Sequence, residues 1–129
     1  MIVVDSSVWI DFFNGHTTPE VQQLDQLLGT TPIAVGDVIL VEVLQGFSNN
    51  RDHATAERLF RGLPVLEMLG TANAYSAAAL YRQLRQRGIT VRRTIDGIIA
   101  TACINAELPL LFSDRDFLPY VEVFGLQRP

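Results

Sequence analysis

Short apolar runs and longer amphipathic stretches alternate along this chain, and the alternation predicts strands and helices in turn. β-Branched runs predict strands at "MIVV", "PIAV" and "PVLEML", and "PLLFS" predicts a later strand. A short last strand is expected over 121–124. The stretches between these runs have apolar residues at the spacing of a helix, as in Val21, Leu24, Leu27 and Leu28.

The expected helices have typical start and stop residues. "SSVWIDFF" opens on a hydroxyl cap, and "TPEVQQLDQLLG" begins with Thr-Pro and ends with Gly. "DVILVEVLQG" also suits a strand, but a helix capped by Asp37 and stopped near Gly46 is favoured. The remaining helices are "RDHATAERLFRG", "TANAYSAAALYRQLRQRG" and "TIDGIIATACINAEL". Because strands alternate with helices, we expect one α/β domain over 1–129, with a central, mostly parallel sheet flanked by helices.

Composition agrees with a single domain that has a sizeable core. Of the 129 residues 48% are hydrophobic and 19% are charged, which argues against disorder. No apolar run approaches the roughly 20 residues of a membrane span, and the start has no basic leader, so we expect a cytoplasmic protein without a membrane partner. The single cysteine, Cys103, excludes an internal disulfide and is expected to be a buried structural residue. His16 and His53 are expected at the surface.

Five acidic residues occupy unusual places in this pattern. Asp5 ends the first strand, and Asp114 and Asp116 follow the late strand, so all three are expected at carboxyl ends of parallel strands, where ligands bind. Glu42 interrupts an apolar run, and Asp96 lies on the helix face that should meet the sheet. Ordinary alternatives exist: Asp5 could be a helix cap and Asp96 a first-turn acid. Asp114 and Asp116 could be turn residues. Neither a cap nor a turn explains Glu42.

The joint arrangement of these acids points to a metal site. Converging carboxylates repel one another and their pKa values rise, and a bound divalent cation removes that repulsion. The ligands would all be oxygens, with no set of cysteines and histidines. The cation is therefore expected to be hard, Mg²⁺ or its substitute Mn²⁺.

Basic residues are few, and they are clustered. The formal net charge is −4, all ten basic residues are arginine, and five of them fall in "YRQLRQRGITVRR". Guanidinium groups bind phosphate in a bidentate manner, which makes this cluster a candidate RNA contact. A solvated helix face explains the spacing equally well. The candidate residues are Arg85, Arg87, Arg92 and Arg93, and the last two lie just before Asp96.

Four motifs resemble a known family when they are taken in order. Asp5 in "IVVDSSVWIDFF", Glu42 in "VILVEVLQG", Asp96 in "RRTIDGIIATACI" and Asp114 in "LLFSDRDF" are similar to the acidic quartet of PIN-domain nucleases. Their order, the chain length and "DRDF" most resemble the VapC toxins of bacterial toxin–antitoxin pairs. The resemblance covers essentially the whole chain. Asp116 is an alternative or additional fourth acid.

The resemblance implies a Mg²⁺-dependent endoribonuclease that cleaves transfer or ribosomal RNA. One or two ions would bind Asp5 and Asp96, with Asp114 or Asp116, and Glu42 would contribute directly or through water. Ser6 and Ser113 would hold ligands or waters in place. The implied partners are a VapB-type antitoxin, the RNA substrate and a second copy in a homodimer. Apolar residues of the first two helices could form a groove for the antitoxin where they are not core: Trp9, Phe12, Phe13, Leu24 and Leu28.

Two other classes of function compete with this one. A receiver-like phosphotransfer domain also places acids at strand ends, but it normally needs a lysine beside the phosphate, and this chain has none. A catalytically silent α/β module that binds RNA or protein, with acids kept for structure, is the stronger alternative. Metal-dependent RNA cleavage distinguishes it from the nuclease.

Overall fold

A parallel sheet forms the centre of the molecule, which is described for residues 1–129 by a computed structural model. Its strands are β1 (Ile2–Val4), β2 (Ile33–Gly36), β3 (Val65–Leu66) and β4 (Leu110–Leu111). The order is β3-β2-β1-β4, and every neighbouring pair is parallel. The predicted α/β class with a parallel sheet is therefore confirmed.

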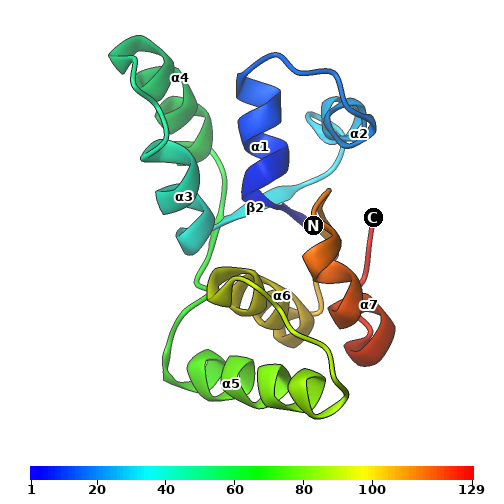
Figure 1. Ribbon diagram of the computed structural model, residues 1–129. Helices are drawn as coiled ribbons and strands as arrows, with labels where there is room; N and C mark the ends of the chain where they lie inside the picture. Colours follow the sequence, from blue (N-terminus) through cyan, green and yellow to red (C-terminus); the bar gives the residue numbers. More distant parts are fainter.

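Helices connect the strands and cover both faces of the sheet (Figure 1). All six helices expected between the strands are present. The connections are α1 (Ser6–Phe13) and α2 (Pro19–Leu27), then α3 (Asp37–Leu44) and α4 (Asn50–Arg61), then α5 (Thr71–Gln86) and α6 (Thr94–Ala106). A single 3₁₀ turn, Arg115–Phe117, leads into α7 (Leu118–Phe124). No helix is both long enough and apolar enough to cross a membrane.

Helix α6 is the most buried helix because it lies between the sheet and α5 (Figure 1). Its residues Ile99, Ala100 and Cys103 are fully buried, whereas α5 buries only Leu84. On another side of α6, Gly97 faces α7: a Cβ atom there would lie 2.8 Å from the hydroxyl oxygen of Tyr120. Glycine therefore allows α7 to pack closely against α6.

Two local expectations were wrong, and a third was only partly correct. The segment 121–124 belongs to helix α7, because a proline in the first turn and Gly125 in a left-handed conformation (φ 73°) provide helix start and stop signals that outweigh its β-branched residues. Asp37 does not cap α3, because the N-cap residue is Gly36. The Oδ1 of Asp37 instead accepts hydrogen bonds from the N–H groups of Val38 and Met68, at 2.8 and 2.9 Å. The expected third strand pairs only over Val65–Leu66.

The strand order creates a place for a binding site. From β1 the chain moves to β2 and β3 on one side, and it returns to the other side of β1 as β4. The carboxyl ends of β1 and β4 therefore lie at the point where the strand order reverses, which is where open α/β sheets bind ligands. Val4 pairs with Leu111, and the N–H of Asp5 donates to the carbonyl of Leu111 at 2.9 Å. The two strand ends that carry acids are thus neighbours.

Candidate active site

Asp5 has two roles in the structure. It is the N-cap of α1, and its Oδ2 accepts hydrogen bonds from the Ser7 hydroxyl at 2.8 Å and the Ser7 N–H at 3.4 Å. The residue is only 4% exposed. Burial raises the pKa of its carboxyl, and the hydrogen bonds from Ser7 act in the opposite direction. The capping interpretation of Asp5 is confirmed, so α1 is capped by a carboxylate and not by a hydroxyl residue as expected. The charge of Asp5 also raises the pKa of Asp96, described next.

Asp96 is the central acid of the cluster. It lies in the first turn of α6, is 3% exposed, and its Oδ2 is buried without a hydrogen-bond partner. Burial raises the pKa of Asp96 to about 6, against an ordinary value of 3.8; Arg93 opposes the increase, and Asp5 and Asp114 add to it. A buried carboxylate oxygen without a donor is costly, so this atom marks a place where a cation would stabilise the fold.

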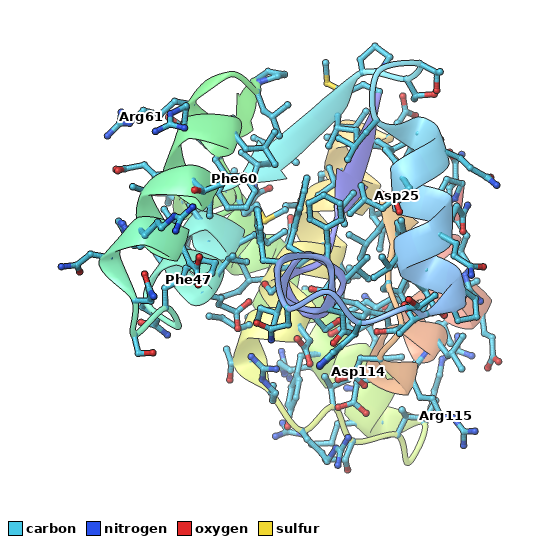
Figure 2. All side chains as sticks on the ribbon, turned by 90° about the horizontal axis from the view of Figure 1, so that it is seen from above. Asp25, Phe47, Phe60, Arg61, Asp114 and Arg115 are labelled. Atoms are coloured by element: carbon cyan, nitrogen blue, oxygen red, sulfur yellow. The ribbon has the colours of Figure 1, made fainter.

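Asp114 and Asp116 complete a trio with Asp96. Each residue contributes one carboxylate oxygen to a group of three oxygens that lie within 4.8 Å of one another. The turn interpretation also holds, because the Asp114 Oδ1 accepts the Asp116 N–H at 2.9 Å. Figure 2 shows Asp114 beside Arg115 on the segment that follows β4. Asp5, which was expected among the direct metal ligands, lies outside this trio.

Glu42 is held at the edge of the cluster from two sides. Its Oε1 accepts the Ser6 hydroxyl at 2.6 Å, and its Oε2 accepts a hydrogen bond from Arg93. The Glu42 side chain is 15% exposed, and Ser6 is buried. Ser6, which was expected to hold ligands or waters in place, thus holds Glu42.

Ser113 reaches the cluster through Ser7, a residue that the sequence did not single out. Its hydroxyl lies 3.2 Å from that of Ser7, which in turn donates to Asp5. Ser7 therefore links the loops that follow β1 and β4. Its place two residues after a helix-capping aspartate was the available signal, since that position faces the cap side chain.

The arginine cluster divides into two groups. The Arg92 Nε donates to the Asp116 Oδ2 at 3.1 Å, and Arg93 is bonded to Glu42. Arg85 and Arg87 are exposed and form no ion pair; the Arg85 guanidinium lies 5.8 Å from the centre of the Tyr81 ring. Arg85 and Arg87 remain predicted RNA contacts. The role of Arg92 and Arg93 as counter-ions of the acids was not foreseen.

The remaining candidate residues lie outside the acidic cluster. Cys103 is buried, and burial raises the pKa of its thiol to about 12, in agreement with a structural role. His16 is exposed as expected, but His53 is half-buried, with its ring centre 6.4 Å from that of Phe47. The surface position expected for His53 is therefore only partly correct.

The apolar residues of the first two helices are only partly available as a surface. Trp9 and Leu24 are fully buried in the core, and the others are half-buried: Phe12, Phe13 and Leu28. A small hollow of about 80 Å³ lies between α1 and α3 rather than between α1 and α2. It is lined by Ile10, Phe13, Asn14, Val43, Gly46 and Phe47. Figure 2 places Phe47 and Phe60 together on this side of the molecule.

The donor set fits a divalent metal ion. It consists of carboxylate oxygens, it includes a buried oxygen without a donor, and it lies at the switch point of the sheet. Five carboxylates and two guanidinium groups leave a formal charge of −3 when all are ionised. Oxygen-rich, negatively charged sites of this kind bind hard cations.

Comparison with known proteins agrees with this geometry. Residues 2–121 match the PIN domain family. The chain is 32% identical over 129 residues to a VapC ribonuclease of Mycobacterium bovis and to ribonuclease VapC11 of Mycobacterium tuberculosis, covering 98% of this chain and 96% of each relative. The chain therefore belongs to the PIN-domain family, within its VapC group.

Solved structures share the fold across the whole chain. VapBC2 from Rickettsia felis, bound to a DNA fragment from its promoter, matches with a TM-score of 0.76 at 17% identity, covering 100% of this chain and 98% of the other. DNA-bound VapBC from Salmonella typhimurium matches with a TM-score of 0.68 at 18% identity, covering 99% and 96%. Both structures are of toxin–antitoxin assemblies of the VapBC type.

Proposed function

We propose that this protein is the toxin of a toxin–antitoxin pair and acts as a Mg²⁺-dependent endoribonuclease. The observation that carries the proposal is the buried Asp96 oxygen without a partner, in a trio with Asp114 and Asp116 at the switch point of the sheet. The ribonuclease names of relatives at 32% identity support the reaction type.

Each acid contributes to the reaction in its own way. Asp96, Asp114 and Asp116 would hold the cation, which when bound lowers the pKa of a coordinated water and stabilises charge on the phosphate. Ser7 orients Asp5, and Ser6 orients Glu42, so these two carboxylates are positioned to accept hydrogen bonds from metal-bound waters. Asp96 binds a cation in its ionised form. Because its pKa is about 6, cation affinity should decline as the pH falls below that value.

The substrate is expected to be transfer or ribosomal RNA. Arg85 and Arg87 are exposed and free of acidic partners, so their guanidinium groups can bind RNA phosphates. Replacing both with glutamine should weaken RNA binding and reduce its salt dependence, because fewer counterions are released. An unchanged salt dependence would mean that these arginines are only a solvated helix face.

A cleavage assay tests the central proposal. Purified protein with Mg²⁺ should cleave RNA, and EDTA should abolish the cleavage. Asp96→Asn should be inactive but folded, whereas Asp25→Asn, which changes an exposed acid on α2 away from Asp114 (Figure 2), should be fully active. If the wild type binds RNA or protein but cleaves nothing with any divalent metal, the silent binding module is the correct function.

A VapB-type antitoxin is the proposed partner, supported by the VapBC assemblies that share this fold. We propose that an apolar antitoxin segment lies along the hollow between α1 and α3, and that one of its basic residues reaches the acids. Ile10, which is 39% exposed in that hollow, offers a test. Ile10→Asp should prevent copurification with the small protein encoded beside the gene. Val41→Asp, at a 61% exposed position of α3 outside the hollow, should not.

The protein is also proposed to form a homodimer, as the resemblance to VapC toxins implies. Light scattering of the purified toxin measures its mass directly. A monomer at all concentrations would contradict this part of the proposal.

A further inference from the structure

Arg93 is a basic side chain at the edge of the acidic cluster. It is the N-cap residue of α6, and its guanidinium donates to the Glu42 Oε2 while the side chain stays 55% exposed. The negative charge of Asp96, followed by that of Glu42 and Asp5, raises the pKa of Arg93. Together with Arg92, Arg93 therefore offsets part of the negative charge of the cluster.

This contact conflicts with a bound metal ion. A divalent cation at Asp96, Asp114 and Asp116 would repel the guanidinium, because both groups are positively charged and both interact with Asp96. Waters bound to that cation would also compete with Arg93 for Glu42, whose two oxygens accept hydrogen bonds from Ser6 and Arg93. Since a half-exposed ion pair opens at small cost, Arg93 is the group that can move.

An RNA phosphate at the metal would provide Arg93 with a new partner. The phosphate brings negative charge next to the cation, and guanidinium binds phosphate oxygens in a bidentate manner. Arg93 directly precedes α6 and therefore lies within three residues of Asp96 in the chain. A bound metal would thus weaken the contact of Arg93 with Glu42, and a bound RNA phosphate would replace it.

We propose that Arg93 is a substrate-binding residue that exchanges partners: it binds Glu42 in the metal-free protein and turns to the RNA phosphate when a cation occupies the cluster. This inference rests on the proposed function, because it requires that the cluster binds a metal and RNA. It assigns to Arg93 two opposite effects, one that weakens metal binding and one that strengthens RNA binding. A purely structural arginine would have neither.

The first test measures metal binding alone. Mn²⁺ is titrated into metal-free protein and free Mn²⁺ is followed by electron paramagnetic resonance. Arg93→Gln should bind Mn²⁺ about threefold to tenfold more tightly than the wild type, because a repelling charge and a competitor for Glu42 are both removed. Arg58→Gln, which removes an exposed arginine of α4 without an ion pair, should be unchanged. In a Glu42→Gln background the effect of Arg93→Gln should be smaller.

The second test measures RNA binding without cleavage, with a nuclease-resistant phosphorothioate RNA in the presence and absence of Mn²⁺. The wild type should bind RNA more tightly when Mn²⁺ is added, and Arg93→Gln should lose most of this gain. Arg93→Lys retains the charge but not the bidentate geometry. It should keep wild-type affinity for Mn²⁺ and lose only part of the RNA affinity.

The outcomes separate this inference from the proposed function. If the wild type binds Mn²⁺ and cleaves RNA while Arg93→Gln, folded by circular dichroism, binds Mn²⁺ like the wild type, the exchange is wrong and the function stands. An RNA affinity that falls equally with and without Mn²⁺ also overturns the exchange. If the wild type binds no Mn²⁺, both the exchange and the proposed function are wrong.

Discussion

Removal of the Asp96 charge should stabilise the metal-free protein while it abolishes metal binding. Asp96 is 3% exposed and has a carboxylate oxygen without a partner. In Asp96→Asn a neutral amide of almost the same size replaces a buried charge, so the packing around it should be preserved. The cost of burying that charge in the absence of metal is thereby removed.

The size and pH dependence of the effect follow from the pKa of Asp96. This pKa is about 6 in the folded protein, against 3.8 for an ordinary aspartate. The difference between the two values corresponds to a loss of about 3 kcal/mol of unfolding free energy when Asp96 is ionised. The unfolded chain releases the proton first, so the stability of the wild type falls as the pH rises from about 4 to about 6, and the full penalty persists above that range. At about pH 4 the wild type carries a neutral Asp96 and should resemble the variant. At about pH 8 the variant should be more stable by roughly 1–3 kcal/mol, the lower values allowing for relaxation of the neighbours.

Urea unfolding in EDTA, followed by circular dichroism, measures this difference at both pH values. Addition of Mg²⁺ at the higher pH should then stabilise the wild type and have little effect on the variant, because only the wild type binds the ion. Asp25→Asn is the matched control, and its stability difference should be small at both pH values. If Asp96→Asn is no more stable than the wild type at the higher pH, or if the difference is the same at both, the assignment of Asp96 as a destabilising buried charge is wrong.

Three other substitutions test the structure around the cluster. Gly97→Ala should lower the unfolding free energy, measured with urea, by about 1–3 kcal/mol, because the added Cβ would lie 2.8 Å from the Tyr120 hydroxyl oxygen. Combination with Tyr120→Phe should recover most of this loss, and the absence of any recovery would contradict the contact. Asp37→Ala should also cost about 1–3 kcal/mol in the same assay, since it leaves the Met68 N–H without its acceptor, yet Mn²⁺ binding should be unchanged. Ser6→Ala should reduce RNA cleavage while Ser6→Thr retains it, because only the hydroxyl bonded to Glu42 matters; equal activities would exclude that role.

The secondary structure was largely predictable because its signals are local. Thr18 caps α2 through the hydrogen bond that its side chain accepts from the Val21 N–H, and Gly88 follows α5 with a positive φ of 80°. Such signals act over a few residues and can be recognised in any sequence. The error over 121–124 arose where two local signals compete, since β-branched residues favour a strand and the flanking Pro119 and Gly125 favour a helix.

The acids themselves could also be found from the sequence, because each interrupts an apolar pattern. Asp5 and Asp114 were expected near each other from parallel strand ends alone, and the neighbouring strands β1 and β4 bring their loops together. The sequence did not determine which acids approach most closely. Asp116, named as an alternative or additional fourth acid, joins the trio, whereas Asp5 is hydrogen-bonded to Ser7.

The sequence by itself thus determined the alternation of strands and helices, the family and the set of acidic residues, because propensities, caps and apolar periodicity are written in neighbouring positions. Only the tertiary structure decided the partners of those acids. Ser7 meets Ser113 across 106 positions and Arg93 meets Glu42 across 51, and both contacts depend on strand order and helix packing. A hydrogen bond between distant residues requires a particular distance and angle, and no local pattern of residues specifies either.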